Sequence, residues 1–223
     1  MLNDLKQGAG ANIPLAMSAI VYGGVLGVLS AQQQVSWAEM MAMNLFMFAG
    51  SAQFVAVEMW QAPLPVWQIV FAVFVINLRY LFIGASLQPV FQSTRLAGKV
   101  AMMHLVADEN WAVTISEHRK RGVTPFFLLG GGLLLLYAWS AGTLSGNLLG
   151  EFIAHPEKYA LDFAFVAVFA ALALSLWRGK EDLIPWLVAA GLAIVAEWLL
   201  PGKWYVVVGG VGGSLTAALT YKR

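Results

Sequence analysis

Three short groups of polar residues interrupt otherwise apolar stretches of this sequence, and they are the positions where binding or proton transfer could occur. They lie in residues 44–54, 77–79 and 108–110. Polar and ionisable groups inside apolar membrane segments are costly, so they are retained mainly at substrate or ion pathways. These three groups are therefore the candidate site.

The first group is centred on Gly50 and Ser51, in the middle of the apolar segment Trp37 to Trp60. Both residues are weak helix formers and favour a broken helix. A helix that opens there exposes N–H groups where its dipole is positive, and such an end binds a carboxylate. Open backbone at membrane depth is tolerated where it lines a cavity, although close helix packing by small residues is the alternative explanation. The other candidate substrate-binding residues of this segment are Asn44, Phe48 and Gln53.

The second group contains Asn77 and Arg79, which lie in the otherwise apolar span Val66 to Leu87. A guanidinium at bilayer depth costs about 3 kcal/mol or more, so Arg79 needs a partner. It could clamp a substrate carboxylate, lock two helices in a structural ion pair, or extend to the membrane interface. The candidate partners are Glu58, Asp108, Glu109 and Glu197.

The third group is the pair Asp108 and Glu109, within the semi-apolar segment Leu96 to His118. Two adjacent acids cannot both face lipid, so one of them can hold a proton at neutral pH and carry a coupling proton. Ordinary solvated acids in a short loop at the membrane face are the alternative. His104 has no second ligand at metal spacing, and we expect no metal and no cofactor.

The elements that position these groups are membrane helices. Of the 223 residues, 60% are hydrophobic and 11% are charged, whereas soluble domains carry about 25% charged residues. Absence of cysteine excludes disulfides and thiol chemistry, and a net charge of +1 speaks against a nucleic-acid partner. No phosphate loop, nucleophile elbow or zinc-protease pattern is found, so an enzyme is not expected.

About 20 apolar residues cross a bilayer as a helix, and the fold class is therefore an all-α polytopic membrane bundle forming one transporter domain, residues 1–223. Two segments, 37–60 and 96–118, are difficult to assign as spans. The first contains the predicted helix break, and the second contains several charged residues. The remaining predicted spans are 13–29, 66–87, 124–144, 159–177, 183–200 and 204–220.

Basic residues orient these spans. They occur at Lys6, at 118–121, at Arg178 with Lys180, and at Lys222 with Arg223. Placing all of them in the cytoplasm makes the number of crossings even, and eight crossings result if both difficult segments cross. Seven crossings remain open, with one terminus outside or one difficult segment re-entrant.

A similar pattern in the two halves of the sequence also predicts two four-helix repeats, residues 1–121 and 122–223. Pro65 and Pro185 each open a span, and the polar residues Asn77 and Glu197 follow twelve positions later. Repeats of this kind are common in transporters, but proline is frequent at membrane interfaces in any case, so chance is the alternative.

The motifs Phe48-Ala49-Gly50-Ser51-Ala52-Gln53-Phe54, Asn77-Leu78-Arg79-Tyr80-Leu81 and Asp108-Glu109, in this order, resemble the AzlC-type branched-chain amino acid exporter family. The resemblance implies the large subunit of a two-component exporter in the bacterial plasma (inner) membrane. Its partner would be a small AzlD-type membrane subunit. Its substrates would be leucine, isoleucine, valine and, in some members, methionine, exported in antiport with protons. The family pattern usually has histidine where Tyr80 stands, so a role of this side chain in proton movement is in doubt.

The resulting hypothesis is a carrier for a zwitterionic amino acid. Gly50, Ser51 and Gln53 would hold the carboxylate, and Asn44 and Asn77 would offer hydrogen bonds. An acid among Glu58, Asp108 and Glu109 would meet the ammonium group or carry the proton. The alternatives are a non-transporting scaffold or sensor subunit and a carrier for a different small zwitterion.

Overall fold

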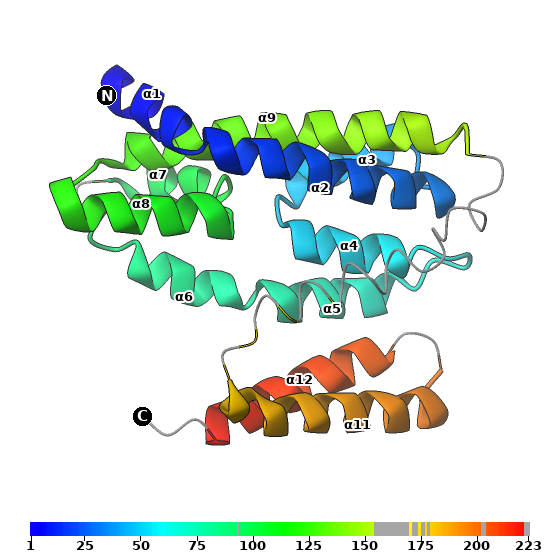
Figure 1. Ribbon diagram of the computed structural model, residues 1–223. Helices are drawn as coiled ribbons and strands as arrows, with labels where there is room; N and C mark the ends of the chain where they lie inside the picture. The colour runs from blue at the N-terminus through cyan, green and yellow to red at the C-terminus, as the bar shows by residue number, and fades with distance from the viewer. Residues whose placement is uncertain are drawn as a thin grey trace. The chain divides into compact units, whose positions relative to one another are not determined.

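The computed structural model describes residues 1–92, 94–153, 170, 174, 177, 179–201 and 204–220 (Figure 1). Within this part of the chain the regular elements are all helices. Four of them are long and apolar enough to cross a membrane: Ile13–Gln32, Val66–Ser86, Pro125–Gly150 and Lys180–Leu199. Helix Trp204–Thr220 is apolar but shorter. The all-helical prediction is confirmed, while the predicted span 159–177 lies almost entirely outside the described residues.

The chain forms two compact units. The first comprises Met1–Gly50 and Leu78–Ala154, and the second comprises Ser51–Asn77 and His155–Arg223. The first unit holds α1 (Leu2–Ala11), α2 (Ile13–Gln32), α3 (Trp37–Phe46), α6 (Arg79–Ser86), α7 (Leu96–Met103), α8 (Asp108–Arg121) and α9 (Pro125–Gly150). The second holds α4 (Gly50–Glu58) beyond its first residue, α5 (Val66–Asn77), the 3-10 turn η3 (Lys180–Asp182), α11 (Leu183–Leu199) and α12 (Trp204–Thr220). These units do not coincide with the repeats 1–121 and 122–223, which stay a prediction.

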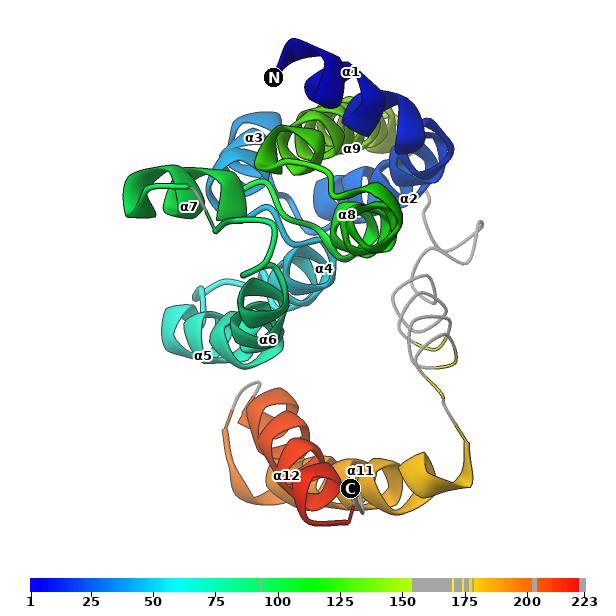
Figure 2. The same cartoon turned by 90° about the vertical axis from the view of Figure 1, so that its left-hand side faces the viewer.

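Helices α2 and α9 form the scaffold of the first unit and run side by side (Figures 1 and 2). Their backbones touch at glycines. A Cβ atom on Gly27 would overlap the carbonyl oxygen of Thr143, and one on Gly146 would overlap that of Gly24. Small residues let membrane helices approach closely where lipid provides no hydrophobic drive for association. The glycines of α2 and α9 thus determine how closely these two helices pack.

Buried amides fix the register of this scaffold and attach α3 to it. The Asn147 Nδ2 group donates to Ser30 Oγ at 2.7 Å and to the Val35 carbonyl at 2.9 Å. Asn44 Nδ2 donates to Thr143 Oγ1 at 2.7 Å. Polar pairs of this kind join membrane helices. As a result, α3 lies beside the second half of α9.

Both difficult segments are interrupted helices. In the first, α3 ends at Phe46, residues 47–49 are not helical, and α4 begins at Gly50. The predicted break is therefore present, but it precedes Gly50 and Ser51, which instead begin the second helix. The aromatic ring of Trp139 explains the need for glycine there, because a Cβ on Gly50 would lie 3.1 Å from its Cη2 atom.

The second interruption separates α7 from α8 and comprises residues 104–107. Asn110 organises it. Its Oδ1 atom accepts from the Ala107 backbone N–H at 2.8 Å, and its Nδ2 group donates to the Leu105 carbonyl at 2.9 Å. A side chain that serves both partners satisfies backbone groups that the broken helix leaves open. Helix α8 ends at Arg121 and is capped by Gly122, whose φ of +68° is the left-handed conformation that favours glycine.

The second unit is built on an α11–α12 hairpin and the α4–α5 pair. Gly209 and Gly213 of α12 face Ala189 of α11, so these helices also pack through small residues. Val55, Met59 and Ala72 form the apolar contact between α4 and α5, to which Val206 and Val207 of α12 are added.

Candidate functional site

A pocket in the first unit lies where both interruptions approach α2 and α9. Its cavity volume is about 120 Å3, which is smaller than the range of about 300–1,000 Å3 that is usual for drug-sized ligands and restricts it to a small molecule. Its lining residues are Leu15, Ser18, Ala19 and Tyr22 of α2, Phe48 of the first interruption, Gly50 at the start of α4, Ala107 of the second interruption, Glu109 in the first turn of α8, and Leu135 and Trp139 of α9. All ten belong to the first unit.

The polar part of the pocket combines a carboxylate with the beginnings of two helices. Glu109 is the only charged residue among the ten and lies in the first turn of α8. Gly50 is the first residue of α4. The first N–H groups of a helix have no partner within it and carry the positive end of its dipole. Ser18 and Tyr22 add hydroxyl groups from α2.

The apolar part of the pocket consists of aliphatic and aromatic side chains. Phe48 and Ala107 pack against the buried core formed by Ala16, Leu135 and Ala138. Trp139 is almost completely buried and covers Gly50. This arrangement suits a small molecule that carries an anionic group, a cationic group and an apolar side chain.

Arg79 forms an ion pair with Asp108, the neighbour of the pocket acid. Arg79 Nη1 lies 2.6 Å from Asp108 Oδ2, and the two side chains are 35% and 45% exposed. Among the four predicted partners the structure thus pairs Arg79 with Asp108. The Arg79 guanidinium also lies 5.4 Å from the centre of the Tyr80 ring. This pairing balances the charge of Asp108, and Glu109 is the acid that lines the pocket.

The two interruptions are also joined directly. His104 Nε2 lies 2.6 Å from the backbone carbonyl oxygen of Leu45, in the last turn of α3. Carbonyl groups at the end of a helix lack partners within it, so a histidine donor satisfies one of them. From the sequence, His104 was considered only as a metal ligand, and this contact was not predicted.

Of the predicted site residues, the structure brings Phe48, Gly50 and Glu109 together in the pocket. Asn44 is completely buried and bonded to Thr143 instead of lining the pocket. Arg79 and Asp108 belong to the first unit but are not among the ten lining residues. The remaining four belong to the second unit and do not line the pocket: they are Ser51, Gln53, Glu58 and Asn77. The amide oxygen of Asn77 is buried and has no hydrogen-bond partner among the described residues.

The pocket residues of α2 were missed. Leu15, Ser18, Ala19 and Tyr22 follow the spacing of three and four residues that places side chains on one face of a helix. Two of them carry hydroxyl groups within an apolar span. These hydroxyl groups on one helix face could have indicated the pocket. However, a hydroxyl group in a membrane helix also bonds readily to its own backbone, as Ser18 does to the Leu15 carbonyl.

Comparison with known sequences gives a decisive result. The family model described as AzlC protein matches residues 14–153. The chain belongs to the AzlC family. The matched range contains all ten pocket residues, and the resemblance predicted from three motifs is confirmed.

Individual relatives of this AzlC-family protein are also membrane proteins, and one of them is itself named AzlC. It is 22% identical over 196 residues to the branched-chain amino acid transport protein AzlC of Bacillus subtilis, covering 87% of this chain and 76% of that protein. It is 25% identical over 209 residues to an uncharacterised membrane protein of Helicobacter pylori, covering 93% and 90%. A membrane protein of Archaeoglobus fulgidus is 28% identical over 178 residues, covering 79% and 77%. No solved structure matches the chain.

Proposed function

We propose that this AzlC-family membrane protein is a secondary active transporter that exports branched-chain amino acids across the bacterial plasma membrane. The observation that carries the proposal is the pocket, in which one carboxylate and the start of α4 stand beside an apolar wall. The substrate class follows the family resemblance and the Bacillus subtilis relative, whose name assigns it to branched-chain amino acid transport.

In this proposal the amino acid lies across the pocket. Its carboxylate group meets the backbone N–H of Gly50, the first residue of α4, where the helix dipole is positive. Its ammonium group meets the Glu109 carboxylate, and its branched side chain contacts Phe48, Leu135 and Trp139. Each part of a leucine or valine molecule thus has a chemically matched surface.

Proton coupling follows from the single pocket acid. A carboxylate that leaves water is neutralised either by a bound cation or by a proton. Glu109 would therefore carry the substrate ammonium outward and a proton inward, which is antiport. Asp108 is paired with Arg79 and does not line the pocket, so it takes no part in this exchange.

The finer assignments follow the family resemblance alone. They are the role of large subunit, a small AzlD-type membrane partner, export rather than import, and the bacterial inner membrane. Substrates extend to methionine if the apolar wall adapts to an unbranched chain.

Reconstitution in liposomes tests the proposal. The purified chain, with and without the small partner, should exchange labelled leucine or valine, and an inward proton gradient should drive net export from the compartment that corresponds to the cytoplasm. Glu109→Gln should abolish proton-driven export, whereas Glu151→Gln, an exposed acid at the end of α9, should leave it unchanged.

Two further variants test the site itself. Gly50→Leu fills the start of α4 beside Trp139, and Arg79→Ala removes the partner of Asp108. If both variants fold and exchange leucine at the normal rate, the site assignment is wrong. A complex that binds its partner but gives no flux for any amino acid would favour the scaffold or sensor alternative.

A further inference from the structure

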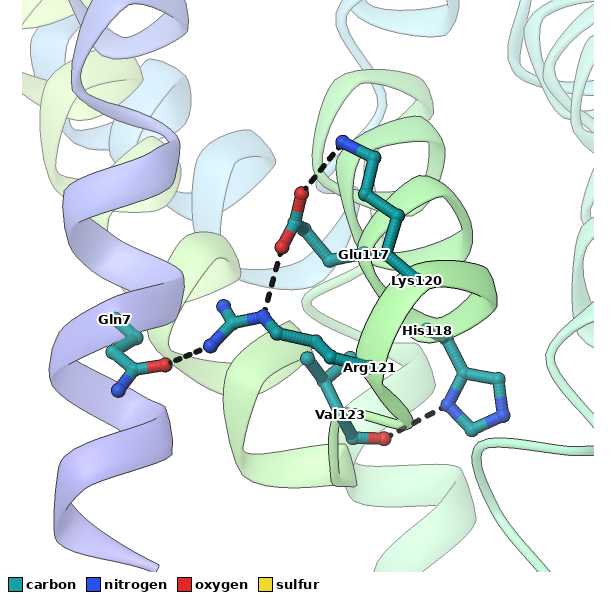
Figure 3. Close-up of polar contacts among 6 residues, drawn as sticks. All are labelled: Gln7, Glu117, His118, Lys120, Arg121 and Val123. Atoms are coloured by element: carbon teal, nitrogen blue, oxygen red, sulfur yellow. Dashed lines mark hydrogen bonds and ion pairs between the residues drawn. The ribbon is translucent and has the colours of Figure 1, made fainter.

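The two ends of each interrupted segment can be assigned to a membrane face from contacts inside each unit. At one end of the first unit, Arg121, the last residue of α8, bonds to Gln7 of α1 (Figure 3), and Thr124 of the α8–α9 connection bonds to Asp4. The basic residues of the N-terminal helix and of 118–121 therefore lie at the same end of this unit. Basic connections are cytoplasmic, so this end is the cytoplasmic one.

Helices α2 and α9 both run from this end to the opposite one. Gly8 packs at Phe127, Gly24 at Gly146, and Gln32 Nε2 donates to the Gly150 carbonyl at 3.1 Å. The connection 33–36, which leads into α3, is thus at the outer face.

The second unit contains another connection that can be assigned to the outer face. The basic residue Lys180 precedes α11 and is cytoplasmic by the same rule, so one crossing by α11 places the turn before α12 outside. Pro201 of that turn and Tyr205 in the first turn of α12 line a groove together with Gln61, Ala62, Pro63, Leu64 and Pro65, which connect α4 to α5. Residues 61–65 are therefore also at the outer face.

We propose that both interrupted segments are re-entrant and enter the membrane from opposite faces. Segment 37–58 starts and ends outside. Its helices, α3 with 10 residues and α4 with 9, measure about 15 and 14 Å at 1.5 Å per residue, and each is long enough for about half of the 30 Å hydrocarbon layer. Its interruption at 47–49 is consequently at mid-membrane depth.

Segment 96–121 is the cytoplasmic counterpart. Helix Val66–Ser86 crosses from the outer turn 61–65, so residues 87–95 are cytoplasmic, and α8 ends at the basic residues 119–121. The 8 residues of α7 and the 14 of α8 give about 12 and 21 Å, neither of which crosses the hydrocarbon layer. The contact of His104 with Leu45 joins the two interruptions.

This topology replaces eight crossings by six, counting the span predicted for 159–177, and keeps every basic cluster in the cytoplasm. Non-helical backbone at membrane depth occurs where it is buried in protein or lines a cavity, and both interruptions line the pocket. The inference rests on the proposed function only in treating the pocket as the transport site. The sidedness itself requires no transport.

The chain contains no cysteine, so single cysteines report sidedness without background. Ala62→Cys and Gln92→Cys probe the two decisive turns, with Phe152→Cys as the outer and Lys120→Cys as the cytoplasmic reference; all four positions are exposed. Each variant is labelled with a membrane-impermeant maleimide in intact spheroplasts and in inverted vesicles.

We expect Ala62→Cys to label with Phe152→Cys in spheroplasts, and Gln92→Cys to label with Lys120→Cys in inverted vesicles. With eight crossings, Ala62→Cys would label in inverted vesicles and Gln92→Cys in spheroplasts, and that result overturns the proposal. Exchange of only one probe overturns the re-entrant assignment of the segments it bounds. Gln61→Cys and Gln88→Cys replace any variant that fails to insert. Correct sidedness without leucine flux would reject the proposed function and leave the topology standing.

Discussion

His104 and Leu45 occupy equivalent places in the two interrupted segments. Each lies three residues before a residue that lines the pocket, Ala107 in one segment and Phe48 in the other, and the His104 ring meets the Leu45 carbonyl at 2.6 Å. This contact ties the end of α3 to the end of α7. It therefore sets the separation of the two interruptions, both of which contribute residues to the lining of the pocket.

We predict that His104→Leu weakens amino acid binding more than it slows transport at saturation. Loss of the contact releases one interruption from the other, and the pocket is then formed only part of the time, which raises the apparent KM by roughly 10-fold for about 1.4 kcal/mol. His104→Gln retains an N–H donor and should restore much of the affinity. The dependence of the leucine exchange rate on leucine concentration gives the apparent KM and the saturated rate of each variant. An equal loss in the two variants would show that the hydrogen bond is not the cause.

The Arg79–Asp108 pair should behave as a coupled unit. Removal of one member leaves the other charge half-buried and unmatched, so Arg79→Gln or Asp108→Asn alone should lower stability by roughly 1–2 kcal/mol. The double variant should be more stable than either single one, because both charges are gone. Thermal unfolding in detergent of all four proteins gives the coupling free energy. If the stability lost in the double variant equals the sum of the losses in the two single variants, Arg79 and Asp108 are not energetically coupled.

Much of this arrangement could be predicted from the sequence because hydrophobic length and charge report directly on lipid. The uninterrupted apolar runs predicted α2, α9, α11 and α12, since a span in a bilayer needs about 20 apolar residues whatever its neighbours are. The weak helix formers Gly50 and Ser51 predicted an interruption within three residues of the observed one. These signals are local, so one sequence contains them.

The composition of the pocket could not be predicted in the same way. Glu109 and Phe48 were noticed because polar or motif residues stand out, whereas Leu15, Leu135 and Trp139 look like any other lipid-facing or packing residue. Asn44 was assigned to the site for its polarity, yet Thr143, 99 positions later, takes its hydrogen bond. Which of two polar residues meets substrate depends on long-range contacts that residue type does not encode.

The glycine seam between α2 and α9 should tolerate no added methyl group. In Gly146→Ala the new Cβ meets the Gly24 backbone, which cannot move without separating the helices, so a loss of about 1–3 kcal/mol is expected. Gly10→Ala in α1 is the matched control, because nothing lies within 4 Å of its added Cβ and alanine favours the helix. Detergent thermal unfolding should show a lower Tm for the first variant and an equal or higher Tm for the second.

Stability should respond to acid through Glu117, in the last turn of α8. Hydrogen bonds from Lys120 and Arg121 hold the pKa of this partly exposed carboxyl below its ordinary value (Figure 3). A lowered folded-state pKa means that the stabilising contribution is present above the unfolded-state value of about 4.3 and is lost as pH falls through the folded-state value. Wild type should therefore exceed Glu117→Gln slightly in Tm at pH 7, and the difference in Tm should disappear as the pH falls below the unfolded-state value and through the lower folded-state value. A gap that persists in acid would exclude this origin.

Trp139 should limit the size of the transported side chain. Its ring forms part of the apolar wall and covers Gly50, so Trp139→Leu enlarges the pocket next to the proposed carboxylate site. Because one methylene group in an apolar pocket changes discrimination by about 1–3 kcal/mol, the ratio of phenylalanine to valine exchange should rise by roughly 10-fold or more. Tyr137→Leu, an exposed aromatic position two residues away on α9, controls for general effects on that helix. Competition of unlabelled amino acids against labelled leucine measures the ratio. If the two variants keep the wild-type preference while both still transport leucine, the wall of the substrate site lies elsewhere.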